Sequence, residues 1–306
     1  MQDQTEYDQL ESLAKVDLRS LPLIQGKVFE TISLLDDPDS DFYQVIDQLS
    51  PDITAKFIEI AGSSLYGQKI RSIDHAVRLL GYKQMRQILA TSILVNQLSQ
   101  SSSKSFKLDK FHKQAQLCAG IALCLGRIVG YPDKAQLFTV SLFNNIGKLI
   151  IAVYFTEEYE AIVDLKHHEG VSSNEAEKRI LGLNHAEIGA LVLKQCHLPP
   201  EVYNAVRFHE DETLSISDNE QFQLFLILRK ASDLANRFSL PAQEFSPQAL
   251  SLQFQETIAE GQGVHQALSS DFEKNQDYRQ ILEQSINRGA ELIARELAKF
   301  FPPRQL

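Results

Sequence analysis

Three consecutive residues in this 306-residue sequence, His167, His168 and Glu169, are of types that bind metal ions. They end a segment whose apolar pattern predicts a helix over 157–168. Successive side chains of a helix point about 100° apart, so adjacent residues do not readily hold one ion between them. We therefore interpret these three residues as the solvated end of a helix.

The cysteines offer neither a disulfide framework nor an obvious catalytic thiolate. Cys118, Cys124 and Cys196 are odd in number and include no CxxC pair, which also excludes a zinc site of four thiolates. Cys118 and Cys124 fall within a very apolar predicted helix, where the thiolate form is disfavoured. The sequence also lacks the GxGxxG, GxxxxGKS/T, GxSxG and HExxH motifs, so none of these enzyme signatures is present.

Almost every segment has apolar residues at the spacing of a helix, and we find no credible strand. The pattern predicts an all-α fold, a multi-helix bundle. The apolar run over 149–155 fits a helix or a buried strand by pattern alone, and we favour a helix because no partner strand is apparent. Further helices are predicted at about 111–129, 157–168, 173–181, 185–195, 199–209 and 220–237, with a final amphipathic helix through Leu282 and Leu297.

Charge is unevenly distributed along the first third of the chain. The net charge of −10 argues against bulk binding to nucleic acid or anionic lipid. Residues 1–60 carry 13 acids and 4 bases, whereas residues 61–113 carry 2 acids and 9 bases. Such a contrast is typical of a solvated face beside an acidic segment. The alternative is a surface for an acidic partner, formed by Arg71, Arg78, Lys83 and Arg86.

The sequence predicts a protein without a membrane segment. Residues Met1–Glu6 lack the basic and apolar parts of a signal peptide. The longest uncharged apolar runs, such as 149–155, are far shorter than the roughly 20 residues that a helix needs to cross a bilayer. We expect a soluble, cytoplasmic protein with reduced cysteines.

A series of short motifs follows along the chain between about residues 19 and 240. No single motif is specific, but their order is informative. The motifs are Leu21-Pro22-Leu23, Leu34–Asp39, Ala61–Gly67 and Ser72–Gly81 in the first half, and Ser141–Leu149, Gly182–Leu191, Leu198–Glu201 and Ala205–His209 in the second half.

In this order the motifs resemble the HDOD family, the HD-related output domain of bacterial signalling proteins. The resemblance implies an N-terminal helical subdomain followed by an HD-like helical bundle. We divide the chain accordingly into an N-terminal extension (1–20), the N-terminal helical half (21–100), a linker suggested by a serine-rich run (101–107), the HD-like bundle (108–240) and a C-terminal helical extension (241–306).

The resemblance also implies what a catalytic relative would need. HD-superfamily phosphohydrolases bind a divalent metal through a histidine, an adjacent His-Asp pair and a later aspartate, and the metal activates a water for attack on phosphorus. The corresponding positions here are Gln114 (or His112 in a shifted register), Asn144, Asn145 and Asp233, and of these only Asp233 matches. An asparagine amide is a weak, uncharged metal ligand compared with a histidine or an aspartate. We therefore expect no metal or other cofactor, with a divalent ion such as Mn, Fe or Mg as the alternative.

Three further residues form a candidate ligand pocket at the vestigial site that the resemblance implies. His185 and His209 are candidates because related metal-dependent phosphodiesterases use additional histidines, and Lys148 could hold an anion. More ordinary roles are a cap or core hydrogen bond for His185, a helix-end position favoured by the helix dipole for His209, and an ion pair for Lys148.

We expect a non-catalytic bacterial signal-transduction module that recognises a partner protein or a small ligand. The replacement of the metal-binding pair by Asn144 and Asn145 makes an enzyme the less favoured interpretation. One alternative is a divergent metal-dependent phosphohydrolase or phosphodiesterase that uses His185, His209 and Asp233. A second is a nucleotide-binding sensor without turnover. The sequence names neither the signalling partner nor the ligand.

Overall fold

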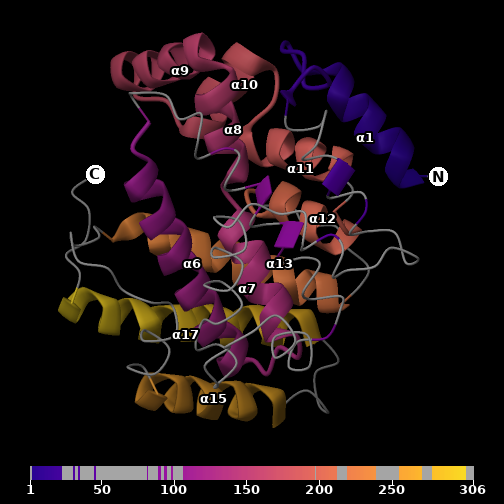
Figure 1. The fold of residues 1–306 in the computed structure, drawn as a ribbon. Coiled ribbons are helices and arrows are strands. Elements are labelled where there is room, and N and C mark those ends of the chain that lie inside the picture. Colours follow the sequence, from indigo (N-terminus) through magenta and orange to yellow (C-terminus); the bar gives the residue numbers. More distant parts are fainter. Residues whose placement is uncertain are drawn as a thin grey trace. The chain divides into compact units, whose positions relative to one another are not determined.

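A computed structural model describes residues 2–22, 106–196, 198–211, 219–238, 255–270 and 278–300, with single residues between 30 and 98. Helices dominate these residues, which contain no strand, so the predicted all-α class is confirmed (Figure 1). The helices are α1 (Gln2–Ser12), α6 (Leu108–Ile128), α7 (Lys134–Phe143), α8 (Ile146–Tyr154), α9 (Thr156–Glu169), α10 (Ser173–Leu181), α11 (His185–Gln195), α12 (Pro200–Phe208), α13 (Asn219–Arg237), α15 (Gln255–Ser270) and α17 (Tyr278–Phe300).

The chain forms two compact units, each made from two separate stretches of sequence. The first unit comprises Met1–Leu108 and Asn145–Arg207, and the second comprises Asp109–Asn144 and Phe208–Leu306. The boundary therefore passes between the adjacent residues Asn144 and Asn145. The five sequence ranges given above, including the linker at 101–107, stay a prediction.

The first unit is built around the packing of α8 against α11. Helix α8 is buried along most of its length, including Leu149, Ile150 and Ile151. This burial explains why the apolar run over 149–155 also fits the pattern of a core strand. Local signals fix the neighbouring helix ends. Ser172 caps the start of α10, and Gly182 ends it with a left-handed φ of 82°, a conformation that favours glycine.

Two glycines allow the backbones of α8 and α11 to touch. A β-carbon added to Gly147 would overlap the carbonyl oxygen of His185, and one added to Gly189 would lie 3.1 Å from the backbone nitrogen of Gly147. A larger residue at position 147 would therefore push the first turns of the two helices apart. Gly147 is required by this close approach.

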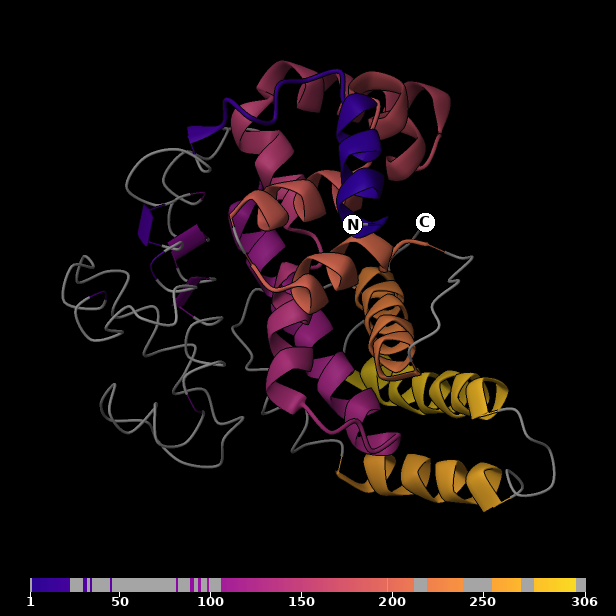
Figure 2. The same cartoon turned by 90° about the vertical axis from the view of Figure 1, so that its right-hand side faces the viewer.

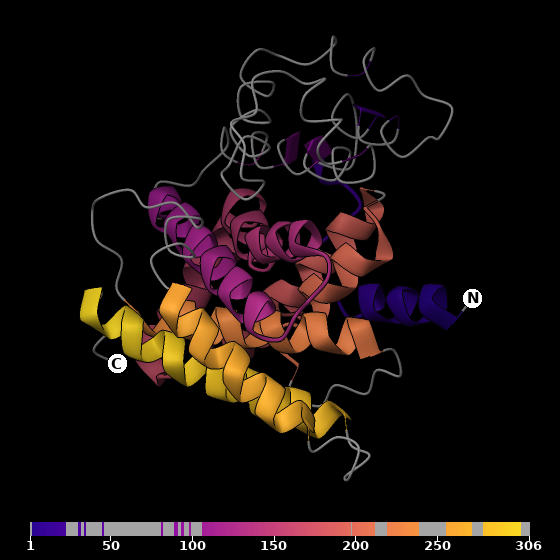
Figure 3. The same cartoon turned by 90° about the horizontal axis from the view of Figure 1, so that it is seen from below.

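The second unit has α6 as its most apolar element. Its residues from Leu117 to Leu125 are almost entirely buried, and Cys118 and Cys124 lie among them. Helix α13 packs against α7 and α17, and α15 lies alongside α17 (Figure 3). Both helices of this C-terminal pair reach α6, because Gly261 of α15 and Gly289 of α17 lie against Ile128. The C-terminal helices thus complete the core around α6.

One stretch of the described residues, Gln136–Tyr154, has the length and hydropathy of a membrane span, with a mean hydropathy of 1.5. Within that stretch, 78% of the apolar window is buried inside the protein. Core helices of soluble proteins have the same properties, so the stretch is compatible with a soluble protein.

Substitution of Gly147 by alanine should lower the free energy of unfolding by about 2–4 kcal/mol, because the new methyl group meets backbone atoms that cannot rotate away. Gly263→Ala is a matched control: Gly263 lies within α15 with nothing within 4 Å of an added β-carbon. That change should be neutral or stabilise the protein by up to about 1 kcal/mol. Urea unfolding followed by circular dichroism measures both, and equal stabilities would contradict the backbone contact.

Candidate functional site

The first unit contains a buried pair formed by His185 and Glu177. His185 is the first residue of α11 and Glu177 belongs to α10. One carboxylate oxygen of Glu177, Oε2, lies 2.7 Å from both the backbone nitrogen and the ring Nδ1 of His185. The side chains of His185 and Glu177 are only 1% and 5% exposed. The pair is therefore shielded from water within this unit.

The start of α11 is held by a capping box that sets the direction of His185. The side chain of Asn184 accepts from the backbone N–H of Glu187, and the side chain of Glu187 accepts from the backbone N–H of Asn184. A backbone N–H in the first turn of a helix has no partner within the helix. Glu177 fills this role for His185, and its negative charge is favoured at the positive end of the helix dipole.

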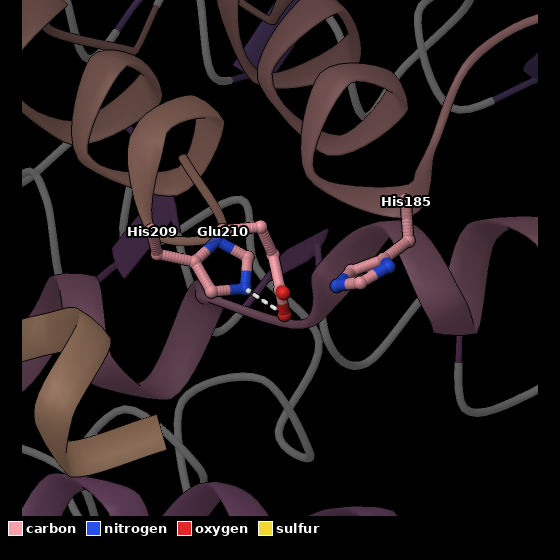
Figure 4. Close-up of side chains that lie close together, drawn as sticks. All are labelled: His185, His209 and Glu210. Carbon is pink, nitrogen blue, oxygen red and sulfur yellow. Dashed lines mark ion pairs between the residues drawn. The ribbon is translucent and has the colours of Figure 1, made fainter. Parts of the chain in front are cut away.

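Charge around Glu177 keeps its carboxyl group ionised. Burial alone would raise the pKa of this group, but the hydrogen bonds and positive charge of His185, together with the ammonium of Lys148, outweigh burial and lower the pKa. An ionised carboxylate only accepts hydrogen bonds, so the Nδ1 of His185 carries the proton that is donated. The other ring nitrogen of His185, Nε2, takes no part in this pair; Figure 4 shows the ring.

Two of the three predicted pocket residues, His185 and Lys148, influence the charge of one carboxylate, and of these His185 contacts it directly. Lys148 lies half-buried in the first turn of α8, and its charge acts on Glu177 together with that of His185. Sequence reasoning missed Glu177. The feature of the sequence that could have indicated it is a carboxylate on the apolar face of an amphipathic helix, next to the buried residues Ala176 and Leu181.

His209, the third pocket residue, belongs to the second unit. It follows the last residue of α12, and its ring is fully buried. Its Nε2 lies 3.4 Å from the Oε1 of the neighbouring Glu210, as Figure 4 shows. Within the second unit, His209 is thus a buried imidazole beside a partly exposed carboxylate.

Two of the predicted vestigial metal positions, Asn144 and Gln114, have side-chain hydrogen bonds to other residues. Asn144 is 0% exposed, and its Nδ2 donates to the sulfur of Cys118 over 3.5 Å. Gln114 donates to the side chain of Asn236 over 3.2 Å, and Asp233 is exposed on α13. In the first unit, Asn145 is buried at the start of α8, where its carbonyl oxygen accepts from the N–H of Lys148. Three amides with one exposed carboxylate do not fit a divalent cation, which prefers charged oxygen or imidazole ligands.

The other reactive or metal-binding residue types that the sequence analysis singled out do not form a site in the part of the chain that the structure describes. Burial raises the pKa of the Cys196 thiol to about 12, so its thiolate is disfavoured at neutral pH. His167 and His168 are exposed in the last turn of α9, and Glu169 there accepts from Arg179. The proposed acidic-partner residues Arg71, Arg78, Lys83 and Arg86 lie outside the described residues.

A family model and solved structures of known proteins agree on one fold. The family model described as HDOD domain matches residues 21–212. An HDOD domain protein of unknown function from Geobacter sulfurreducens has a similar structure, with a TM-score of 0.55, 20% identity and coverage of 84% of this chain and 94% of that chain. A candidate phosphohydrolase from Shewanella amazonensis SB2B also has a TM-score of 0.55 and 20% identity, with 95% and 97% covered.

Two further relatives differ in length from this chain. A candidate signal transduction protein from Marinobacter aquaeolei VT8 has a TM-score of 0.52 and 19% identity, with 94% of this chain and 65% of that chain covered. An uncharacterized protein of Treponema pallidum (strain Nichols) is 22% identical over 215 residues, which span 68% of this chain but 41% of that protein. At these identities the structural likeness is a likeness of fold.

Glu177→Gln should lower the free energy of unfolding by about 2–4 kcal/mol near neutral pH, because it removes a buried, charge-assisted pair. The pKa of Glu177 is lowered in the folded state, so the carboxylate stabilises the protein above its unfolded pKa. That contribution is lost as the pH falls through the folded pKa. The difference between wild type and variant should therefore shrink in acid.

Glu175→Gln serves as the control, since Glu175 lies on the same helix but is half-exposed beside Arg179. Such a surface pair contributes about 0–1 kcal/mol. Urea titrations from pH 7 to well below the ordinary glutamate pKa of 4.5 measure both variants. A pH-independent difference for Glu177→Gln would show that the charge of Glu177 does not stabilise the fold.

Proposed function

Because this chain belongs to the HDOD family, we propose that it is a cytoplasmic bacterial signalling module that acts by recognising a partner protein, without catalysis at a metal centre. The buried amide of Asn144 carries this proposal. It stands where the resemblance implies a metal-binding histidine, and it bonds to the sulfur of Cys118 instead. A buried polar group that is already paired has little to gain from a metal.

Recognition also agrees with the character of the relatives. The Marinobacter aquaeolei protein is described as a candidate signal transduction protein, and the family model that matches this chain is described as HDOD domain. A module of this kind needs a surface that binds its partner and a fold that stays rigid behind that surface. The close packing of α8 against α11 in the first unit supports the proposal of such a fold. Residues Arg71, Arg78, Lys83 and Arg86 stay proposed contributors to an acidic-partner surface.

A divergent phosphohydrolase is the second candidate function. The Shewanella amazonensis protein is described as a candidate phosphohydrolase. One observation favours this alternative: a carboxylate bonded to the Nδ1 of a buried histidine is the arrangement that commonly orients a metal-binding imidazole, and Glu177 is placed in this way for His185. A nucleotide sensor without turnover would instead use Lys148 to bind phosphate.

Protein purified without a chelator should contain no stoichiometric Fe, Mn or Zn and should not hydrolyse phosphomonoesters or cyclic dinucleotides. The reason is the amide side chains at Gln114, Asn144 and Asn145. Elemental analysis and assays of phosphate and nucleotide release measure the two quantities. One or more metal ions per chain, with activity lost in Asp233→Ala, would establish the phosphohydrolase.

A variant that restores the family pair makes the same test sharper. Asn144→His combined with Asn145→Asp should bind no more Mn or Fe than the wild type, because Gln114 still lacks an imidazole. The triple variant with Gln114→His is the matched comparison. Tight metal binding by the double variant would show that the missing first histidine is not limiting.

Nucleotide titration of the wild type, with Lys148→Ala as control, separates the sensor from both other functions.

A further inference from the structure

The first unit holds the N-terminal helix α1 against α11 and α12 through one buried tyrosine. Helix α1 precedes residue 21, where the family match begins. It lies alongside α11 in Figures 1 and 2. Tyr7 is only 2% exposed, and Leu10, one turn later, is also buried. These two side chains form the apolar contact of α1.

Tyr7 lies in a polar and aromatic site rather than a purely apolar one. Its hydroxyl donates to the side-chain oxygen of Asn204 over 2.8 Å, and its ring meets that of Tyr203 edge to face at 5.3 Å. The ammonium of Lys194 lies 4.0 Å from the centre of the Tyr7 ring, and the guanidinium of Arg207 lies 4.8 Å from it. We call Lys194, Tyr203, Asn204 and Arg207 the tyrosine site.

The tyrosine site and α1 are complementary in charge. Helix α1 carries four carboxylates, Asp3, Glu6, Asp8 and Glu11, and no lysine or arginine. The tyrosine site contributes two cations that sit on the face of an aromatic ring, a geometry that stabilises both partners. Gln195, next to Lys194, adds a hydrogen bond to Glu11 over 3.0 Å. The features recognised in α1 are therefore an aromatic residue, an apolar residue one turn later and negative charge.

Helix α1 depends on its docking, whereas the chain that follows has backbone contacts of its own. An isolated 11-residue helix is marginal in water, so α1 depends on its docking for its structure. Beyond it, the backbone N–H of Lys15 donates to the carbonyl oxygen of Leu181 over 2.8 Å, and Gly182 lies directly against the carbonyl oxygen of Leu13. These contacts anchor residues 13–15 independently of the contacts that Tyr7 makes.

We propose that the tyrosine site is a docking surface for an acidic helix of a partner protein that carries a tyrosine or another aromatic residue, and that α1 occupies it within the chain until that helix displaces it. The proposal rests on the recognition function inferred above and names the kind of partner. Docking of α1 is then an intramolecular competition, because a tethered helix binds at a high effective concentration.

A peptide of residues 2–12, held helical by a hydrocarbon staple that replaces the exposed residues Asp8 and Ser12, provides a defined probe that keeps the other three carboxylates of α1. Fluorescence anisotropy measures its binding to the full chain. Tyr7→Ala should raise the affinity at least tenfold over wild type, because the α1 of the chain no longer competes. Adding Arg207→Glu should remove at least tenfold of that affinity, and Tyr7→Ala with Lys110→Glu is the matched control, an equal charge change at an exposed residue of α6.

Two comparisons bear on chemistry. A peptide with alanine in place of its tyrosine should bind at least tenfold more weakly to the Tyr7→Ala chain. Raising NaCl from 50 to 500 mM should weaken binding of the unaltered peptide, since part of the attraction is between the acidic peptide and the half-buried cations Lys194 and Arg207. Equal binding of both peptides, or no binding to Tyr7→Ala, would overturn the proposal.

Hydrogen exchange on the unmutated chain covers the case in which a variant fails to fold. Amides of α1 should exchange at least tenfold faster than those of α11, and saturating peptide should speed α1 further while leaving α11 unchanged. Exchange of α1 as slow as that of α11, with or without peptide, would make α1 a fixed part of the core and overturn the proposal.

Analytical sedimentation tests whether the tyrosine site is occupied instead by the α1 of a second copy of the chain. A wild-type dimer that dissociates on Tyr7→Ala would assign the site to the α1 of a second copy and overturn the assignment within one chain. These outcomes are separate from the proposed function, because a metal-containing, hydrolytic protein would refute the recognition function whatever the peptide does.

Discussion

The contact between the first turns of α8 and α11 determines much of what surrounds it in the first unit. Gly147 brings the backbone of α8 against the carbonyl of His185, and the same turn of α8 carries Lys148. His185 in turn donates to Glu177 from its backbone and its ring. A buried carboxylate is tolerated only where several donors and a positive charge meet it, and this helix crossing assembles them. The packing of the two helices and the charges around Glu177 therefore both depend on glycine, which has no side chain, at position 147.

Local signals made several elements predictable from the sequence. The expected helices over 173–181 and 185–195 coincide with α10 and α11, because Ser172, Asn184 and Gly182 mark helix ends through interactions between residues close in sequence. The run over 149–155 was ambiguous for a physical reason. A helix buried on nearly all sides loses the amphipathic period that distinguishes it from a core strand.

The candidate site was harder to predict, since its interactions join distant residues. Lys148 and His185 were expected at one pocket, but Glu177, which connects them, shows itself only as a carboxylate on an apolar helix face. The role of Tyr7 was also missed. Residues 1–20 read as an extension, and nothing near Tyr7 in the sequence indicates that Lys194, Asn204 and Arg207 surround it. Such contacts depend on tertiary structure alone.

The interleaved course of the chain constrains how the protein can be synthesised. Residues 109–144 leave the ribosome long before α13, α15 and α17, which complete their unit. Until then the part of the apolar surface of α6 that these helices cover is exposed, and exposed surface of this kind promotes aggregation. A gene fragment cut at residue 212, where the family match ends, would leave α6 in that state permanently. The boundary of the family in sequence is therefore not a boundary of folding for this chain.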